Sequence, residues 1–185
     1  HMSFRKTPFK GGFAVACGLV PFLDWLRGLR FTDDDVAYLA TLTGADGQTS
    51  EPMMFLFDSV RNKWLSVESN TFTFNNNSVS NNDWMIIDSA LNSNVGFPMP
   101  YDGVVVRLAV NIQSTNGNTK SFSVVVDTTE ITGVLVTSAS PSTNNVAVAS
   151  NVNINFSAGD YIRLRARGGS GGNLQSVVAT MWVKW

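Results

Sequence analysis

The chain has 185 residues, of which 44% are apolar and only 15% are charged, against roughly 25% charged in ordinary soluble domains. Its 13 basic and 14 acidic residues give a net charge of −1, which provides no electrostatic basis for binding nucleic acid. His1-Met2 is typical of a vector scar, and Cys17 is the one cysteine, so a disulfide framework, a Cys/His metal site and Ser-His-Asp catalysis are not expected. We therefore expect a non-enzymatic protein with no cofactor, no metal and no membrane insertion.

The composition changes near residue 52, which predicts a boundary between two parts. Residues 1–52 hold 5 basic and 6 acidic residues and lack asparagine, whereas residues 53–185 are crowded with Asn, Ser, Thr and Val. Asparagine disfavours helices and tolerates turns. The pattern predicts a small N-terminal appendage over residues 3–52, α/β or helical, after the vector scar at residues 1–2, followed by one domain over residues 53–185.

Local signals in the first part predict a short strand and two helices. The apolar run 13–17 lies between glycines and fits a buried strand. Pro21 begins a short apolar helix that ends near residue 30. Thr32, with acidic residues at 33–35, has the form of an N-terminal cap, which predicts a second helix up to Gly44.

From Met53 onward the apolar residues alternate with polar ones, which is the period of half-buried antiparallel strands. Asn116-Gly117 and the glycine-rich run 168–172 predict two hairpin turns. The number and spacing of the short strands predict a mainly β fold, an antiparallel sandwich or barrel of about ten strands. The predicted strands are 55–57, 63–67, 71–74, 84–87, 104–112, 122–127, 131–137, 146–149, 151–156, 161–167 and 176–184.

The first part carries a family resemblance. A Pro8-x-x-Gly-Gly-Phe-Ala-Val run is followed by Arg30-Phe-Thr and the acidic residues 33–35. Residues 3–45 thereby resemble the N-terminal fragment of nicotinate phosphoribosyltransferases. The phosphoribosyl-diphosphate site, the barrel and the phosphorylatable histidine of that family lie beyond this fragment. The resemblance therefore implies no catalytic residue here, and the chain looks like a mosaic.

The second part resembles a different family. Phe156-Ser-Ala-Gly159-Asp160-Tyr-Ile162 is a hydrophobic-x-x-Gly-Asp-x-hydrophobic strand entry, and residues 177–185 end the chain as an apolar strand. These features resemble the tumour-necrosis-factor-like and complement-head-like jelly rolls, which also occur in fibre tips. The resemblance implies an antiparallel jelly-roll sandwich that assembles as a homotrimer.

Arg163, Arg165 and Arg167 are the first candidate site, because alternate residues of one strand share a face at intervals of roughly 7 Å. Guanidinium groups could bind carboxylate, sulfate or phosphate on a glycan. The alternative is a solvated face or an inter-subunit row of salt bridges, which is the commoner role for charges on a strand. The acidic partners considered for such a row are Asp83, Asp88 and Asp160.

Two polar segments complete the candidate site. Asn76 and Asn81 lie in an Asn-rich stretch expected to be a polar loop, and Tyr101 with Asp102 lies in a turn-like stretch at 96–103. Either segment could bind sugar hydroxyls. Tryptophans and tyrosines could stack on sugar rings, although core packing is the commoner role. These residues are Trp64, Trp84, Trp182, Trp185, Tyr101 and Tyr161.

Together these features predict a trimeric head of a fibre or surface appendage that binds a host receptor or cell-surface glycan, located outside the cell, on the cell surface or on a virion. One alternative is a structural decoration or capsid-surface protein of a virion. Another is a relic of a nicotinate phosphoribosyltransferase without activity.

Overall fold

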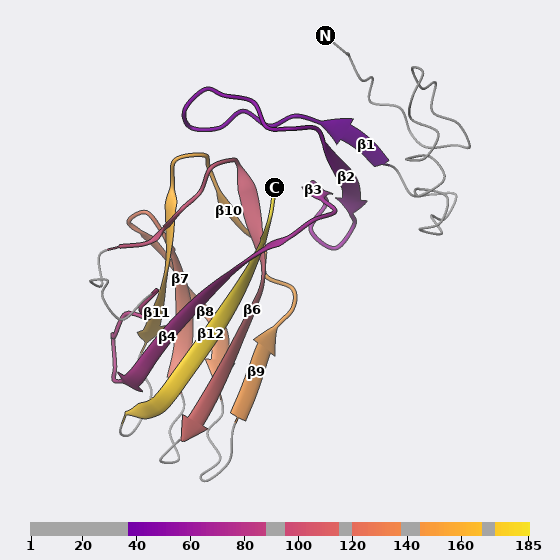
Figure 1. Cartoon of the computed structure of the whole chain (residues 1–185). Coiled ribbons are helices and arrows are strands. Elements are labelled where there is room, and N and C mark those ends of the chain that lie inside the picture. Colours follow the sequence, from indigo (N-terminus) through magenta and orange to yellow (C-terminus); the bar gives the residue numbers. More distant parts are fainter. Residues whose placement is uncertain (1–36, 88–94, 115–119, 138–144, 168–172) are drawn as a thin grey trace.

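The computed structural model describes residues 37–87, 95–114, 120–137, 145–167 and 173–185, and within these ranges the chain forms β-strands and no helix. No membrane-spanning helix occurs among these residues. The mainly β, antiparallel character predicted from the sequence is confirmed. Figure 1 shows two long sheets packed face to face, with a small sheet at the end of the sandwich where the C-terminus lies.

Three sheets make up the structure. The small sheet has the order β1 (Ala37–Ala40), β2 (Met53–Asp58), β3 (Lys63–Ser66). Sheet I has the order β10 (Ile154–Phe156), β6 (Gly103–Ser114), β12 (Leu174–Lys184), β4 (Asn70–Val79), and β9 (Asn145–Ala149) also pairs with β6. Sheet II has the order β5 (Phe97–Pro98), β11 (Tyr161–Arg167), β7 (Lys120–Val126), β8 (Thr129–Thr137).

The core lies between sheets I and II, as strand alternation requires. In β11 the burial alternates strictly, with Ile162, Leu164 and Ala166 fully buried and the arginines between them facing out. Facing residues of β12, β6 and β7 complete the core. These fully buried residues include Ala179, Met181, Val183, Val105, Leu108, Val110, Ile112, Phe122 and Val124.

One side of the sandwich is closed by backbone hydrogen bonds. Residues 83–86 lie between the edge of sheet I and β11 of sheet II. Asn75 and Ile86 exchange both backbone hydrogen bonds, at 2.7 and 2.8 Å, and the Met85 N–H donates to the Leu164 carbonyl at 2.9 Å. The strand predicted at 84–87 is therefore a pair of isolated bridges that joins the two sheets. The opposite side, between β8 and the β9–β10 edge, has no such closure in the described residues.

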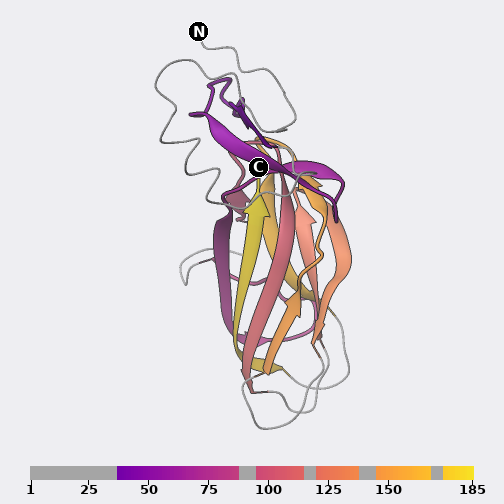
Figure 2. The same ribbon diagram turned by 90° about the vertical axis from the view of Figure 1, so that its right-hand side faces the viewer.

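The small sheet is attached to sheet I at the C-terminal end of the chain. The Ser66 N–H donates to the Trp185 carbonyl at 2.6 Å, and the Trp185 N–H donates to Ser66 Oγ at 3.0 Å. Leu65 packs on Val104, Val106 and Trp182, outside the main core. In Figure 2 the small sheet lies across the end of the long strands.

Arg61, in the turn between β2 and β3, connects the small sheet to the far edge of sheet I. Its guanidinium donates to the carbonyls of Val106 at 2.7 Å, Ser150 at 2.9 Å and Val152 at 2.7 Å. The pairing of β6 with β12 shifts register beside Val106, and residues 150–153 separate β9 from β10 along the edge of the sheet. The three carbonyls therefore lie where the backbone hydrogen bonding between the strands of sheet I is interrupted. The Arg61 guanidinium supplies the hydrogen-bond donors that these carbonyls do not receive from a neighbouring strand.

Asp58 holds the Arg61 side chain in this position. Its Oδ2 accepts from Arg61 Nη1 at 2.6 Å, and its Oδ1 accepts from the Arg61 backbone N–H at 3.0 Å. Burial acts to raise the pKa of Asp58, but these hydrogen bonds outweigh it and hold the pKa below its usual value. The carboxylate therefore stays charged at neutral pH.

The helix predicted from Thr32 to Gly44 is wrong over its second half. Ala37–Ala40 is β1, which pairs antiparallel with β2, and Thr43 forms a bridge with Thr49. The local capping signals are outweighed by tertiary pairing with an apolar strand, a common override of helix propensity. The strand predicted at 13–17, the helix predicted at 21–30, and Cys17 lie outside the described residues. The boundary predicted at residue 52 falls between the paired strands β1 and β2.

Turn and loop predictions were corrected at several places. The strands flanking Asn116-Gly117 are β6 and β7, and those flanking 168–172 are β11 and β12; each pair is split between the two sheets, so neither connection is a hairpin. The Asn-rich residues 75–77 belong to β4 and are not a loop, because they pair with β12. Phe97–Pro98 forms the short strand β5 at a sheet edge, where proline is tolerated. The strand predicted at 151–156 shortens to β10.

Replacing Arg61 by Ala should lower the free energy of unfolding by about 3 kcal/mol, because three carbonyls lose a charged donor and Asp58 loses its partner. Urea denaturation measures this loss. Arg61→Lys should recover part of it, since one ammonium cannot reach all the acceptors.

The matched control is Lys63→Ala on the next strand. Lys63 Nζ donates to the exposed side chains of Asn153 and Asn155, and its loss should cost less than about 1 kcal/mol. Equal losses for Arg61→Ala and Lys63→Ala would contradict the role assigned to Arg61.

Candidate functional site

The arginine row, defined as Arg163, Arg165 and Arg167, lies on the outer face of sheet II. The three side chains project from β11 on the face opposite the core, as the alternation predicted. All three are half-buried, because the side chains of Trp84, whose segment pairs with the edge of β11, and of Glu130 lie against them. The row is therefore covered in part by its own chain.

Aromatic rings separate the cations. The Arg163 guanidinium lies 4.4 Å from the ring centre of Trp84 and 5.0 Å from that of Tyr161, and Arg165 lies 4.7 Å from Trp84. Arg163 Nη2 also donates to the Asp127 carbonyl at 2.5 Å, and its Nε is buried with no hydrogen-bond partner in the described residues. Cation–π stacking of this kind stabilises partly desolvated arginines. It also occupies the faces that a ligand ring would use.

Glu130 on β8 neutralises the other end of the row. Arg167 donates to both carboxylate oxygens of Glu130, and Arg165 Nη1 lies 3.8 Å from Oε2. The hydrogen bond from Arg167 holds the pKa of Glu130 below its usual value, although burial acts in the opposite direction. The same bond raises the pKa of Arg167. The salt-bridge interpretation thus has a partner within the chain, and it is Glu130, which the sequence analysis did not name.

Asn81 and Asn76 lie near this row. Lys120, which is almost fully buried, donates from Nζ to Asn81 Oδ1. Next to it, Asn82 accepts from Arg165 Nε at 3.1 Å and from Arg167 Nη1 at 2.8 Å. Asn76 donates from Nδ2 to the Trp84 carbonyl at 3.1 Å. Asn81 and Asn82 thus tie residues 80–86 to sheet II, and Asn76 ties the same segment to β4 of sheet I.

Tyr101 and Asp102 lie apart from the row, in the turn before β6. Tyr101 contacts Trp185 edge-on at 5.8 Å between ring centres, and Asp102 Oδ1 accepts from the Ala158 N–H at 2.8 Å. Asp102 also lines a cavity of about 430 Å³ beneath the small sheet, together with Trp64 and Trp185. The structure therefore separates the predicted site residues into two groups.

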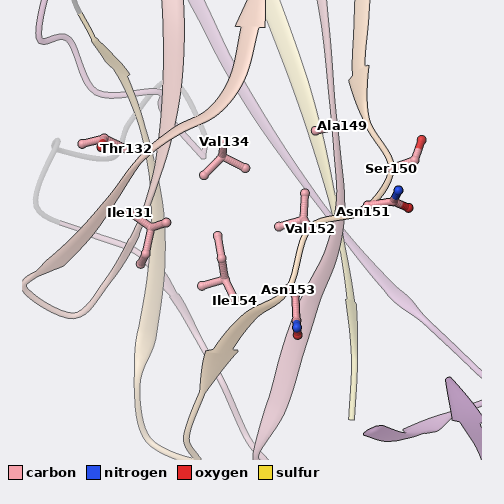
Figure 3. A pocket seen from close by; sticks show the side chains of 9 residues that line it. All are labelled: Ile131, Thr132, Val134, Ala149, Ser150, Asn151, Val152, Asn153 and Ile154. Atoms are coloured by element: carbon pink, nitrogen blue, oxygen red, sulfur yellow. The ribbon is translucent and has the colours of Figure 1, made fainter. Parts of the chain in front are cut away.

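A groove of about 450 Å³ lies on the open side of the sandwich. Figure 3 shows Val134 from β8 and Val152 and Ile154 from the opposite edge pointing into the space between the sheets, with the side chains of Asn151 and Asn153 directed away. The groove is apolar inside and polar at its rim. No sequence signal marks it, because it arises only where two sheet edges face each other.

A third hollow, of about 490 Å³, lies on the outer face of sheet I and is lined by Arg61, Arg107, Trp182 and Lys184 together with Asp58. We call it the basic pocket. Sequence analysis named Trp182 as a possible platform but missed the cations. Arg107 is the one charged residue in the apolar strand predicted at 104–112. A single charge in an apolar strand was the sequence feature that could have marked it as a candidate binding residue.

Comparison with known proteins gives one limited match. No protein-family model matches the chain. A stretch of 39 residues is 41% identical to nicotinate phosphoribosyltransferase of Bacillus subtilis (strain 168), covering 21% of this chain and 8% of that enzyme. The chain thus spans under a tenth of this relative. The partial resemblance to nicotinate phosphoribosyltransferase is confirmed to that extent.

Replacing Glu130 by Gln should lower the free energy of unfolding at neutral pH by about 1–2 kcal/mol, because the arginine row loses its countercharge. In the parent protein this contribution is present above the usual Glu pKa of about 4.3 and is lost as the pH falls through the lowered folded-state pKa. The stability difference between parent and Glu130→Gln should therefore shrink as the pH falls below the usual Glu pKa and vanish once the pH is below the lowered folded-state pKa.

Urea titrations over this pH range measure the difference. Glu51→Gln, at an exposed position, is the control and should differ little from the parent at any pH. A stability gap for Glu130→Gln that persists unchanged in acid would refute the ion-pair role.

Proposed function

We propose that residues 53–185 form a jelly-roll head that assembles as a homotrimer and acts, without catalysis, as a receptor-binding or glycan-binding tip of a fibre or surface appendage. The corresponding location is outside the cell, on the cell surface or on a virion. The observation that supports it most is the order of the strands in the two sheets.

The chain alternates between the sheets: β4, β6, β9, β10 and β12 belong to sheet I, and β5, β7, β8 and β11 belong to sheet II. The last strand of each sheet lies between two early ones, β12 between β4 and β6 and β11 between β5 and β7. Such nested antiparallel strands in two packed sheets are typical of a jelly roll. A simple meander would pair consecutive strands instead.

The outer face of sheet I supports self-association. Two cross-strand rows on this face contain no charged residue, and several of their members are exposed valines: Val146 at 68%, Val148 at 51% and Val178 at 45%. Contiguous exposed apolar surface on a soluble protein usually marks an interface. The rows are Asn75, Val178, Asn111, Val146 and Thr73, Thr180, Ala109, Val148.

A second copy of the chain is the occupant that this neutral face favours. A ligand rich in charge would find no countercharge on the rows, whereas the valines and short polar side chains of another copy would meet no repulsion. Closed symmetry with three copies would repeat one binding site three times and so increase avidity without new contacts.

Light scattering on a sizing column should give three times the mass of one chain. Val148→Lys and Val178→Lys should shift the mass towards one chain, because a charge would be buried at the contact. Val136→Lys is the matched control, since Val136 is equally exposed, at 57%, on the outer face of sheet II. A parent protein with the mass of one chain would refute the trimer.

Binding assays separate the proposed function from its alternatives. Saturable binding to a glycan array or to host cells is expected. A blank array beside saturable binding to capsids would favour the structural virion protein. Detectable phosphoribosyl transfer would overturn the non-enzymatic assignment.

A further inference from the structure

The basic pocket contains more positive charge than the described residues that line it neutralise. Its three cations, Arg61, Arg107 and Lys184, face one carboxylate, that of Asp58. Arg61 already binds Asp58 at 2.6 Å and directs its other N–H groups at backbone carbonyls. The charges of Arg107 and Lys184 therefore have no dedicated partner among the residues that line the pocket.

Arg107 is exposed and its guanidinium lies 5.8 Å from the ring centre of Trp182, the residue opposite it on β12. Within the described part of the chain it forms no hydrogen bond and no ion pair. All of its N–H donors are thus free to bind a group from solution. A planar guanidinium matches the two oxygens of a carboxylate or sulfate.

Lys184 is half-buried, and among the described residues its Nζ makes a single long hydrogen bond, of 3.4 Å, to the Val67 carbonyl. Burial lowers the pKa of Lys184, and Asp58 offsets this only in part because Arg61 acts against it. A partly desolvated ammonium with few acceptors is unfavourable. An anion in the pocket would supply the missing acceptors.

The remaining walls suit a sugar. Arg107 lies over the Trp182 ring at 5.8 Å from its centre, farther than the 4.4 and 4.7 Å of the arginines on Trp84, and this half-buried ring provides an aromatic surface. Ser69, Ser150 and Asn151 provide hydroxyl and amide groups at the rim. Aromatic surface with a few polar groups and a charged anchor is the usual make-up of a small-ligand site. The arginine row differs, because Glu130, Asn82 and the rings already satisfy its cations.

We propose that the basic pocket binds an acidic saccharide, with its anionic group held by Arg107 and Lys184 and its ring against Trp182. This inference rests on the proposed glycan-binding function and names the class of ligand and the site. It moves the site from the outer face of sheet II, where the sequence suggested it, to the outer face of sheet I.

The test uses the whole 185-residue chain and four charged probes: glucuronic acid, N-acetylneuraminic acid, glucose 6-sulfate and glucose 6-phosphate. N-acetylglucosamine is the uncharged comparison. Binding is followed by calorimetry and by the tryptophan indole signals in NMR spectra, with the Trp182 signal assigned from a Trp182→Phe variant. At least one charged probe should bind and shift the Trp182 signal, and comparison among the four identifies carboxylate, sulfate or phosphate as the preferred group.

Arg107→Gln and Lys184→Gln should each weaken binding of that probe by about tenfold or more, as expected for loss of a hydrogen bond to a charged group. Arg165→Gln, which removes a cation from the arginine row, should leave the affinity unchanged. Equal binding of N-acetylglucosamine, no binding of any charged probe, or an effect of Arg165→Gln as large as that of Arg107→Gln would each overturn the proposal.

The mass of each sample, measured by light scattering, separates the two proposals. A chain that binds the acidic probe as a monomer would refute the trimer and leave the pocket in place. A trimer that binds no charged probe would refute the pocket and leave the assembly in place.

Discussion

The pairing of β12 with both β4 and β6 is the interaction on which the rest of the structure depends. This last strand lies in the centre of sheet I, and its partner β4 lies about a hundred residues earlier in the chain. One face of β12 is fully buried in the core through Ala179, Met181 and Val183. Its other face carries Val178, Trp182 and Lys184, so the neutral rows and the basic pocket exist only once this strand is in place. Strands so far apart in the sequence pair slowly, because the chain loses the entropy of closing a long loop before the contacts between the strands stabilise it.

The sequence was sufficient to predict those strands whose structure depends on the local pattern of polar and apolar residues. Residues 161–167 form β11 over the range predicted, because each polar residue faces outward and each apolar residue enters the core. The incorrect predictions concern segments whose structure depends on a strand elsewhere in the sequence. Residues 37–40 belong to a segment with helix signals but pair with β2 as a strand. The turn signal of the Asn116-Gly117 pair in the sequence does not indicate which sheet the next strand joins.

The same distinction applies to the candidate sites. The common face of the arginine row followed from alternation alone. The neutralisation of its charge did not follow, because Glu130 lies more than thirty residues before Arg167, and Trp84 lies on a separate segment that pairs with the edge of β11. The basic pocket was missed for the opposite reason: Arg107 and Lys184 are single charges on separate strands, and only the β6–β12 register brings them together. Density of charge in the sequence was thus a poor guide to charge available for binding.

The position of the basic pocket relates it to the proposed assembly. Arg107 and Trp182 form the cross-strand pair next to the row that contains Ala109 and Thr180, so the pocket begins where the neutral rows end. In an assembly built on these rows, unpaired cations of neighbouring copies would lie near the edge of the contact. An anion bound by Arg107 would reduce their mutual repulsion, and a ligand that prefers the assembled state stabilises it by mass action. Ligand binding and assembly would then favour each other to the same extent, because coupling between two binding equilibria is reciprocal.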